Sequence, residues 1–186
     1  MKRIHKGFTL VELLIVVAIL GVLATMMTMS STDAVDSAGA NAILSNLDSL
    51  RTAAYQMYVN EDFGMMTITF DGVGTPTGGT ADNTVGNKLK AYLGSKASLI
   101  TSSYGLVGSP TEGWYVVYKF TDATDTKGVK AKLAASAEKV ELYGGSTAAP
   151  VITDFAAASR VYYGQGSDGE ALEDISTHKS VALKVR

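Results

Sequence analysis

The feature that most constrains this chain of 186 residues is an apolar run near its start, residues 8–29, which holds one charged side chain, Glu12. Leucine, isoleucine, valine and alanine dominate the run, and no proline interrupts it. As a helix its 22 residues would extend about 33 Å at ~1.5 Å per residue, enough to cross the hydrocarbon core of a bilayer. The pattern therefore predicts a membrane-spanning helix.

Glu12 is costly in such a segment. An ionised group at the centre of a membrane span costs about 2.5–3.5 kcal/mol on insertion scales, which makes it a functional candidate that requires a partner. Three basic side chains, Lys2, Arg3 and Lys6, precede the run. The positive-inside rule predicts that this end stays in the cytoplasm and that the rest of the chain is exported.

An ordinary secretory signal peptide is the simplest alternative, since a basic region, an apolar region and a small-residue site at Ala38–Ala40 are all present. Two observations argue against it. An acidic residue near the start of the apolar region is unfavourable without a use. The small-residue site also lies nine residues beyond the apolar run, which is too far for the usual cut.

The sequence Lys6-Gly7-Phe8-Thr9-Leu10-Val11-Glu12, followed by an uninterrupted apolar helix, resembles the class III signal peptide of type IV pilins and pseudopilins. The resemblance covers about 25 residues, and the other 160 or so carry no family motif. It implies that a membrane-embedded prepilin peptidase removes the leader, residues 1–7, by cutting between Gly7 and Phe8. The same enzyme would methylate the new amine of Phe8.

Cleavage changes the charge of the chain and supplies a partner for Glu12. Loss of Lys2, Arg3 and Lys6 leaves 13 basic side chains against 18 acidic ones, so the formal charge falls from −2 to −5. The family resemblance implies that Glu12 pairs with the amine of Phe8 on a neighbouring subunit. A buried charge is far less costly when it is paired, and only one axial offset brings these groups level. The pair would therefore set the register of assembly.

The helix is predicted to continue through residues 30–61 as an amphipathic segment. Its apolar residues recur at spacings of four, three, four and three, which places them in one stripe: Ile43, Leu47, Leu50, Ala54 and Met57. Residues 8 to about 60 are thus expected to form one helix, with a bend or local melting at Ser30–Asp33. Tyr55 and Tyr58 are expected to lie between this helix and the rest of the fold.

Residues 62–186 are predicted to form a globular α/β headgroup. The pattern predicts strands at 65–70, 114–120, 160–163 and 180–185, helices at 83–93 and 126–137, a glycine-rich loop at 72–79, and an ambiguous segment at 139–143. Trp114, Val116, Tyr118 and Phe120 are expected on one face of their strand. The predicted fold class is α+β, a small antiparallel sheet packed on the second half of a long N-terminal helix.

Two motifs near the C-terminus have weaker chemical readings. Residues 164–169 match G-x-G-x-x-G, but the 17 residues that follow leave no room for the helix, strand and acidic residue of a dinucleotide site. A glycine-rich turn is predicted instead. The neighbouring acidic side chains offer oxygen ligands for calcium, although their spacing is not that of an EF-hand, and a solvated acidic loop is the preferred interpretation: Asp168, Glu170, Glu173 and Asp174.

No catalytic or cofactor chemistry is predicted. The chain has no cysteine, and His178 is the only histidine outside the leader, so a zinc site of usual composition is excluded. His178 is expected to be an exposed loop residue, and no nucleophile and base stand together. The sequence pI of about 5.7 argues against general nucleic-acid binding.

The resemblance implies a structural subunit that forms a helical homopolymer, a type IV pilus filament used in adhesion, twitching motility or DNA uptake. An inner-membrane assembly platform and its ATPase would be its partners. The precursor would lie in membrane lipid as a single-pass inner-membrane protein with its headgroup outside, and would then become part of an extracellular pilus. Three alternatives stay open: a pseudopilin of a type II secretion system, a minor pilin at the tip, and a membrane-anchored binding domain that never polymerises.

Overall fold

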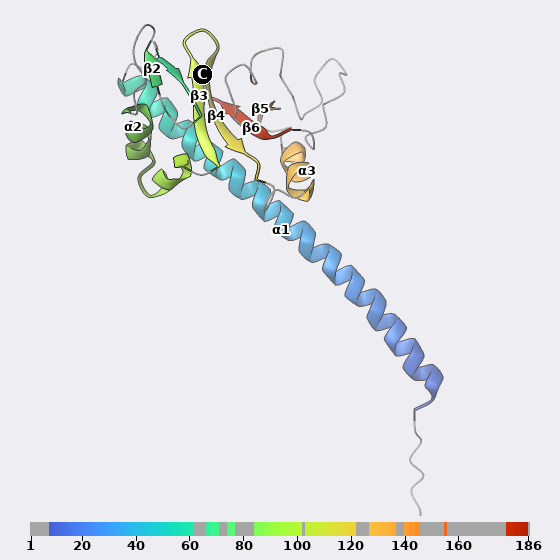
Figure 1. The fold of residues 1–186 in the computed structure, drawn as a ribbon. Coiled ribbons are helices and arrows are strands. Elements are labelled where there is room, and N and C mark those ends of the chain that lie inside the picture. Colours follow the sequence, from blue (N-terminus) through green and yellow to red (C-terminus); the bar gives the residue numbers. More distant parts are fainter. Residues whose placement is uncertain are drawn as a thin grey trace, which may run out of the picture.

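The fold is built on one long helix, α1, which spans Leu10–Glu61. The computed structural model describes residues 8–61, 66–70, 74–76, 84–101, 103–121, 127–136, 140–145, 155 and 178–185. The first half of α1 projects away from the headgroup, and the second half lies against it (Figure 1). This confirms the predicted α+β fold class. The expected local melting at Ser30–Asp33 is wrong, because the helical backbone runs through these residues without a break.

The headgroup contains a six-stranded antiparallel sheet with the order β2-β1-β3-β4-β6-β5. Its strands are β1 Met66–Ile68, β2 Gly74–Pro76, β3 Tyr104–Ser109, β4 Gly113–Lys119, β5 Leu142–Gly145 and β6 Ser180–Lys184. Among the residues described, three further helical segments accompany them: α2 Thr84–Leu93, the 3-10 helix η2 Gly94–Thr101, and α3 Lys127–Ser136. In the described part of the chain, pairs of strands are therefore separated by helical segments and all the strands join one sheet.

The main core lies between α1 and the sheet. The predicted stripe of α1 is buried, with Leu47 and Leu50 fully inaccessible to solvent. Because successive side chains of a strand point to opposite faces, Trp114, Val116 and Tyr118 of β4 all face α1. The predicted face of this strand is thus confirmed, and the amphipathic half of α1 is held by the sheet that it covers.

Truncating a core side chain of α1 should destabilise the headgroup strongly. Leu50→Ala is expected to lower the free energy of unfolding by about 2–5 kcal/mol, because it removes buried methyl groups and leaves a cavity. Val59→Ala on the same helix is the control, since Val59 is 62% exposed and such changes usually stay within about 0.5 kcal/mol. Unfolding of the full chain in detergent, followed by circular dichroism, measures both. Equal losses would contradict the core assignment.

The opposite face of the sheet is also covered, which the sequence pattern did not predict. Val107, Tyr115, Val117, Tyr143 and Ala182 are buried there in a second cluster. Phe155 is fully buried among them, and its ring stacks on Tyr115 at a centroid distance of 5.7 Å. The sheet consequently has an apolar cluster on each face, so both sets of alternating side chains contribute to stability.

Three strands differ from expectation. β2 lies inside the predicted glycine-rich loop and pairs with β1 at the edge of the sheet, where a proline without an N–H is tolerated. β3 was not predicted because Gly105 and Gly108 interrupt its apolar pattern. A Cβ on Gly105 would overlap the carbonyl oxygen of Phe70, and one on Gly108 would overlap the Trp114 ring. The ambiguous segment at 139–143 overlaps β5, which begins at Leu142. The predicted strand at 160–163 lies outside the described residues.

Two predictions about single side chains are wrong. His178 is buried, with 4% of its surface exposed, because it lies two residues before the start of β6 and its ring packs against Gly144 of β5. Its carbonyl oxygen accepts a hydrogen bond from Lys130 Nζ at 3.1 Å. Tyr55 is half-exposed and does not lie between helix and sheet. Tyr58 does, with its ring 6.3 Å from that of Trp114.

Candidate functional site

Glu12 lies in the first turn of α1, where it forms a capping box with Thr9. The backbone N–H of Thr9 donates to Glu12 Oε2 at 2.8 Å, and the backbone N–H of Glu12 donates to Thr9 Oγ1 at 3.2 Å. The Thr9 hydroxyl also donates to Glu12 Oε2 at 2.8 Å. This reciprocal arrangement satisfies backbone N–H groups that a helix start otherwise leaves without a partner.

Thr9 is the site residue that the sequence reasoning missed. The signal was present, because Thr9-Leu10-Val11-Glu12 has the T-x-x-E spacing of a capping box directly before an apolar helix. The cap holds the Glu12 carboxylate at the positive end of the helix dipole. The carboxylate is bonded there to Thr9, which directly follows Phe8 in the chain. The backbone N–H and the hydroxyl of Thr9 both donate to Oε2 of Glu12. Among the described residues, the other carboxylate oxygen of Glu12 stays open to a further hydrogen-bond donor.

The apolar side chains that follow this cap are exposed. Every residue from Phe8 to Met27, a segment here called the rod, is exposed, and the headgroup covers none of it (Figure 1). Phe8 is 88% and Met27 78% exposed. Within the described part of the chain, α1 is the one helix long and apolar enough to cross a membrane. An apolar surface of this extent marks a contact with lipid or with other protein chains.

The remaining predicted site residues lie outside the described residues. They are Gly7 and the acidic set Asp168, Glu170, Glu173 and Asp174, together with the glycine-rich turn at 164–169. Calcium at the acidic loop therefore stays a proposal. Among the residues whose positions are described, no three His, Cys, Asp or Glu side chains come together as a metal site would require.

Comparison with known proteins identifies a motif at the start of the chain. A family model described as the prokaryotic N-terminal methylation motif matches residues 2–28. Searches among curated proteins and among solved structures found no significant match. The matched segment contains Gly7, Phe8 and Glu12, and together with the long apolar helix it fits a membrane-anchored precursor. The chain therefore carries the class III signal peptide of type IV pilins and pseudopilins, a motif of structural proteins, at the head of an α+β pilin-like fold.

Proposed function

We propose that this chain is a prepilin that polymerises, after removal of residues 1–7, into a type IV pilus filament. The exposed rod is the observation that carries the proposal. The headgroup has its own buried apolar core, yet the apolar side chains of the rod are still exposed. Burial of apolar surface is worth about 25 cal/mol per Å². When the rods of many copies pack side by side, each rod buries its apolar surface against its neighbours outside the membrane.

Processing at Gly7 and Phe8 prepares the rod for assembly. Prepilin peptidase removes the leader and methylates the amine of Phe8, and the rod then leaves the bilayer without the leader's positive charges. Thr9 supports the next step, since its capping bonds hold the Glu12 carboxylate at the helix start, close in sequence to Phe8. The Phe8 amine of a neighbouring copy pairs with that carboxylate and sets the register.

The proposed organisation follows from these roles. Residues 1–7 are the leader, 8–29 the membrane and assembly helix, 30–61 its amphipathic continuation, and 62–186 the headgroup. The precursor is a single-pass protein of the inner membrane with its headgroup outside, and the product is an extracellular homopolymer. An inner-membrane platform and its ATPase drive assembly, and the filament serves adhesion, twitching motility or DNA uptake.

A pseudopilin of a type II secretion system is the second candidate, because the motif at residues 2–28 is common to both classes. Loss of the gene separates them. A pilus subunit is required for long surface filaments, whereas a pseudopilin is required for release of secreted proteins. A minor pilin at the tip would be present at a small fraction of the main subunit.

Electron microscopy of sheared surface filaments, followed by mass spectrometry of their subunit, tests the proposal. The expected result is filaments built of this chain, starting at a methylated Phe8. A product that stays in the membrane with residues 1–7 attached, in cells that export other class III substrates normally, would instead support a membrane-anchored binding domain and exclude the filament.

A further inference from the structure

α3 lies beside α1 at the end of the headgroup from which the rod projects (Figure 1). A groove of about 430 Å³ lies between these two helices. Ala40, Asn41 and Leu44 line it on α1, and Lys132, Ala135 and Ser136 line it on α3. Two helices that share a groove in this way can accept a third helix between them, as in other helix-in-groove contacts.

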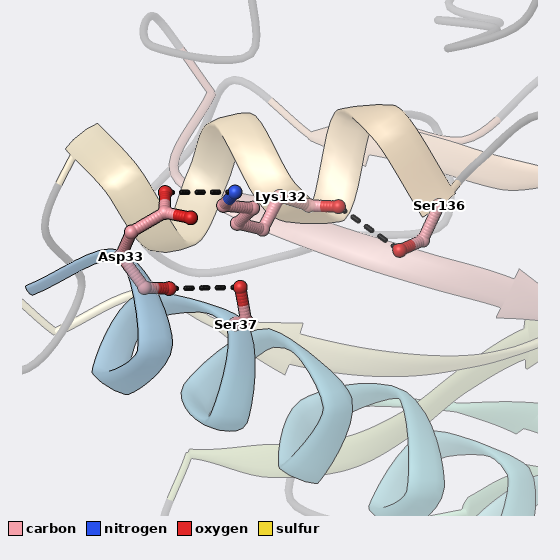
Figure 2. A network of polar contacts seen from close by, with 4 residues as sticks. All are labelled: Asp33, Ser37, Lys132 and Ser136. Carbon is pink, nitrogen blue, oxygen red and sulfur yellow. Dashed lines mark hydrogen bonds and ion pairs between the residues drawn. The ribbon is translucent and has the colours of Figure 1, made fainter. Parts of the chain in front are cut away.

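Groups of α1 and α3 engage three of the polar side chains that line this groove, Ser37, Lys132 and Ser136. Lys132 Nζ lies 2.8 Å from Asp33 Oδ1, which joins α3 to α1 (Figure 2). The Ser136 hydroxyl donates to the Lys132 carbonyl oxygen at 3.0 Å, and the Ser37 hydroxyl donates to the Asp33 carbonyl oxygen at 2.8 Å. Because the ammonium of Lys132 is balanced by Asp33, the groove suits an uncharged, apolar occupant better than an anion.

We propose that this groove receives the rod of a second copy of the chain, an inference that rests on the proposed polymerisation. The chain's own rod cannot enter, because α1 is one continuous helix whose first half points away from the headgroup (Figure 1). Of the two alanines that line the groove, Ala40 is buried and Ala135 is exposed. The small side chain of Ala135 allows another helix to approach to interaxial distances of about 8–10 Å. From Leu13 to Ala24 the rod carries no charge, which matches the groove.

The contact joins copies that are far apart along the filament axis. Ala24 precedes Ala40 by 16 residues and Leu13 precedes it by 27, about 24 and 40 Å of helix. The rod that fills the groove therefore belongs to a copy displaced by about that distance toward the headgroup end. The pairing of Glu12 with Phe8 spans four residues, about 6 Å, so it joins a different pair of copies.

Cysteine cross-linking in filaments tests this contact against a clean background, because the chain has no cysteine. Asn41→Cys in the groove is combined with a single cysteine at each position from 13 to 24. Disulfide-linked dimers are expected to recur along the rod with a period of roughly 3.6 residues, because only one face of the rod helix enters the groove. Asn87→Cys, an exposed asparagine on α2, is the matched control and should lose these dimers.

A water-soluble maleimide separates a protein occupant from lipid. Asn41→Cys should react in the membrane-embedded precursor and be protected in filaments. Protection already in the membrane would assign the groove to lipid and overturn the inference. Filaments without periodic dimers would overturn the groove contact and leave polymerisation standing. Absence of wild-type filaments would overturn both.

Filling the groove is a second, independent test. Ala135→Trp should reduce filament yield while the precursor keeps its level and its unfolding temperature, because Ala135 is exposed in the single chain. Ala91→Trp, at an exposed alanine of α2, should assemble as the wild type does. Normal filaments from Ala135→Trp would overturn the proposal.

Discussion

Replacing Glu12 with alanine is expected to lower filament yield by about 30-fold or more, with the precursor still present in the membrane. Truncating one partner of a buried, hydrogen-bonded charge pair costs about 2–5 kcal/mol, and every 1.4 kcal/mol is about tenfold in an equilibrium. The loss arises because the Phe8 amine of the neighbouring copy would be buried without its counter-charge. Quantifying the subunit in sheared filaments against the membrane pool measures the effect.

Two control variants separate the charge of Glu12 from its role in the capping box. Glu12→Gln keeps an acceptor for the Thr9 N–H and removes the charge, and it is expected to fail as Glu12→Ala does. Thr9→Ala removes the cap and keeps the charge, and losing a cap costs about 1 kcal/mol, so only a severalfold loss is expected. Normal assembly of Glu12→Gln would show that capping, not charge pairing, explains the requirement for Glu12.

Blocking leader removal is expected to abolish filaments. Gly7→Trp should leave a precursor that is longer by residues 1–7, because the proposed cut lies directly after Gly7. Lys2, Arg3 and Lys6 then stay attached, and drawing each charge into an apolar bundle costs about 2.5–3.5 kcal/mol. Immunoblotting of membranes and microscopy of sheared material measure the two effects.

His5→Ala is the matched control for this leader variant, because it changes a leader residue away from the cut and should be processed and assembled normally. Filaments whose subunits still carry residues 1–7 would contradict the proposed role of cleavage. Failure of both leader variants would instead point to a general defect in membrane insertion.

Features that depend on local periodicity could be predicted from the sequence. The apolar run at residues 8–29 and the spacing of Leu47 and Leu50 define one long helix, and the alternation along β4 defines a strand and its inner face. The candidate site at Phe8 and Glu12 is equally local, because these two residues lie four positions apart in the sequence. The cap at Thr9 follows equally from its spacing to Glu12.

Pairings between distant segments were decided by the tertiary structure, because no period in the sequence connects them. Asp33 and Lys132 are 99 residues apart, yet they join α1 to α3 at the groove that Lys132 lines. Phe155 belongs to a second apolar cluster that no strand pattern in the sequence predicts. The ring of His178 packs against Gly144 of β5, a contact that is equally non-local. The amino-acid sequence alone thus determined the helix, its charge and its processing signal, whereas packing across the sheet decided which surfaces were buried and which groove was left open.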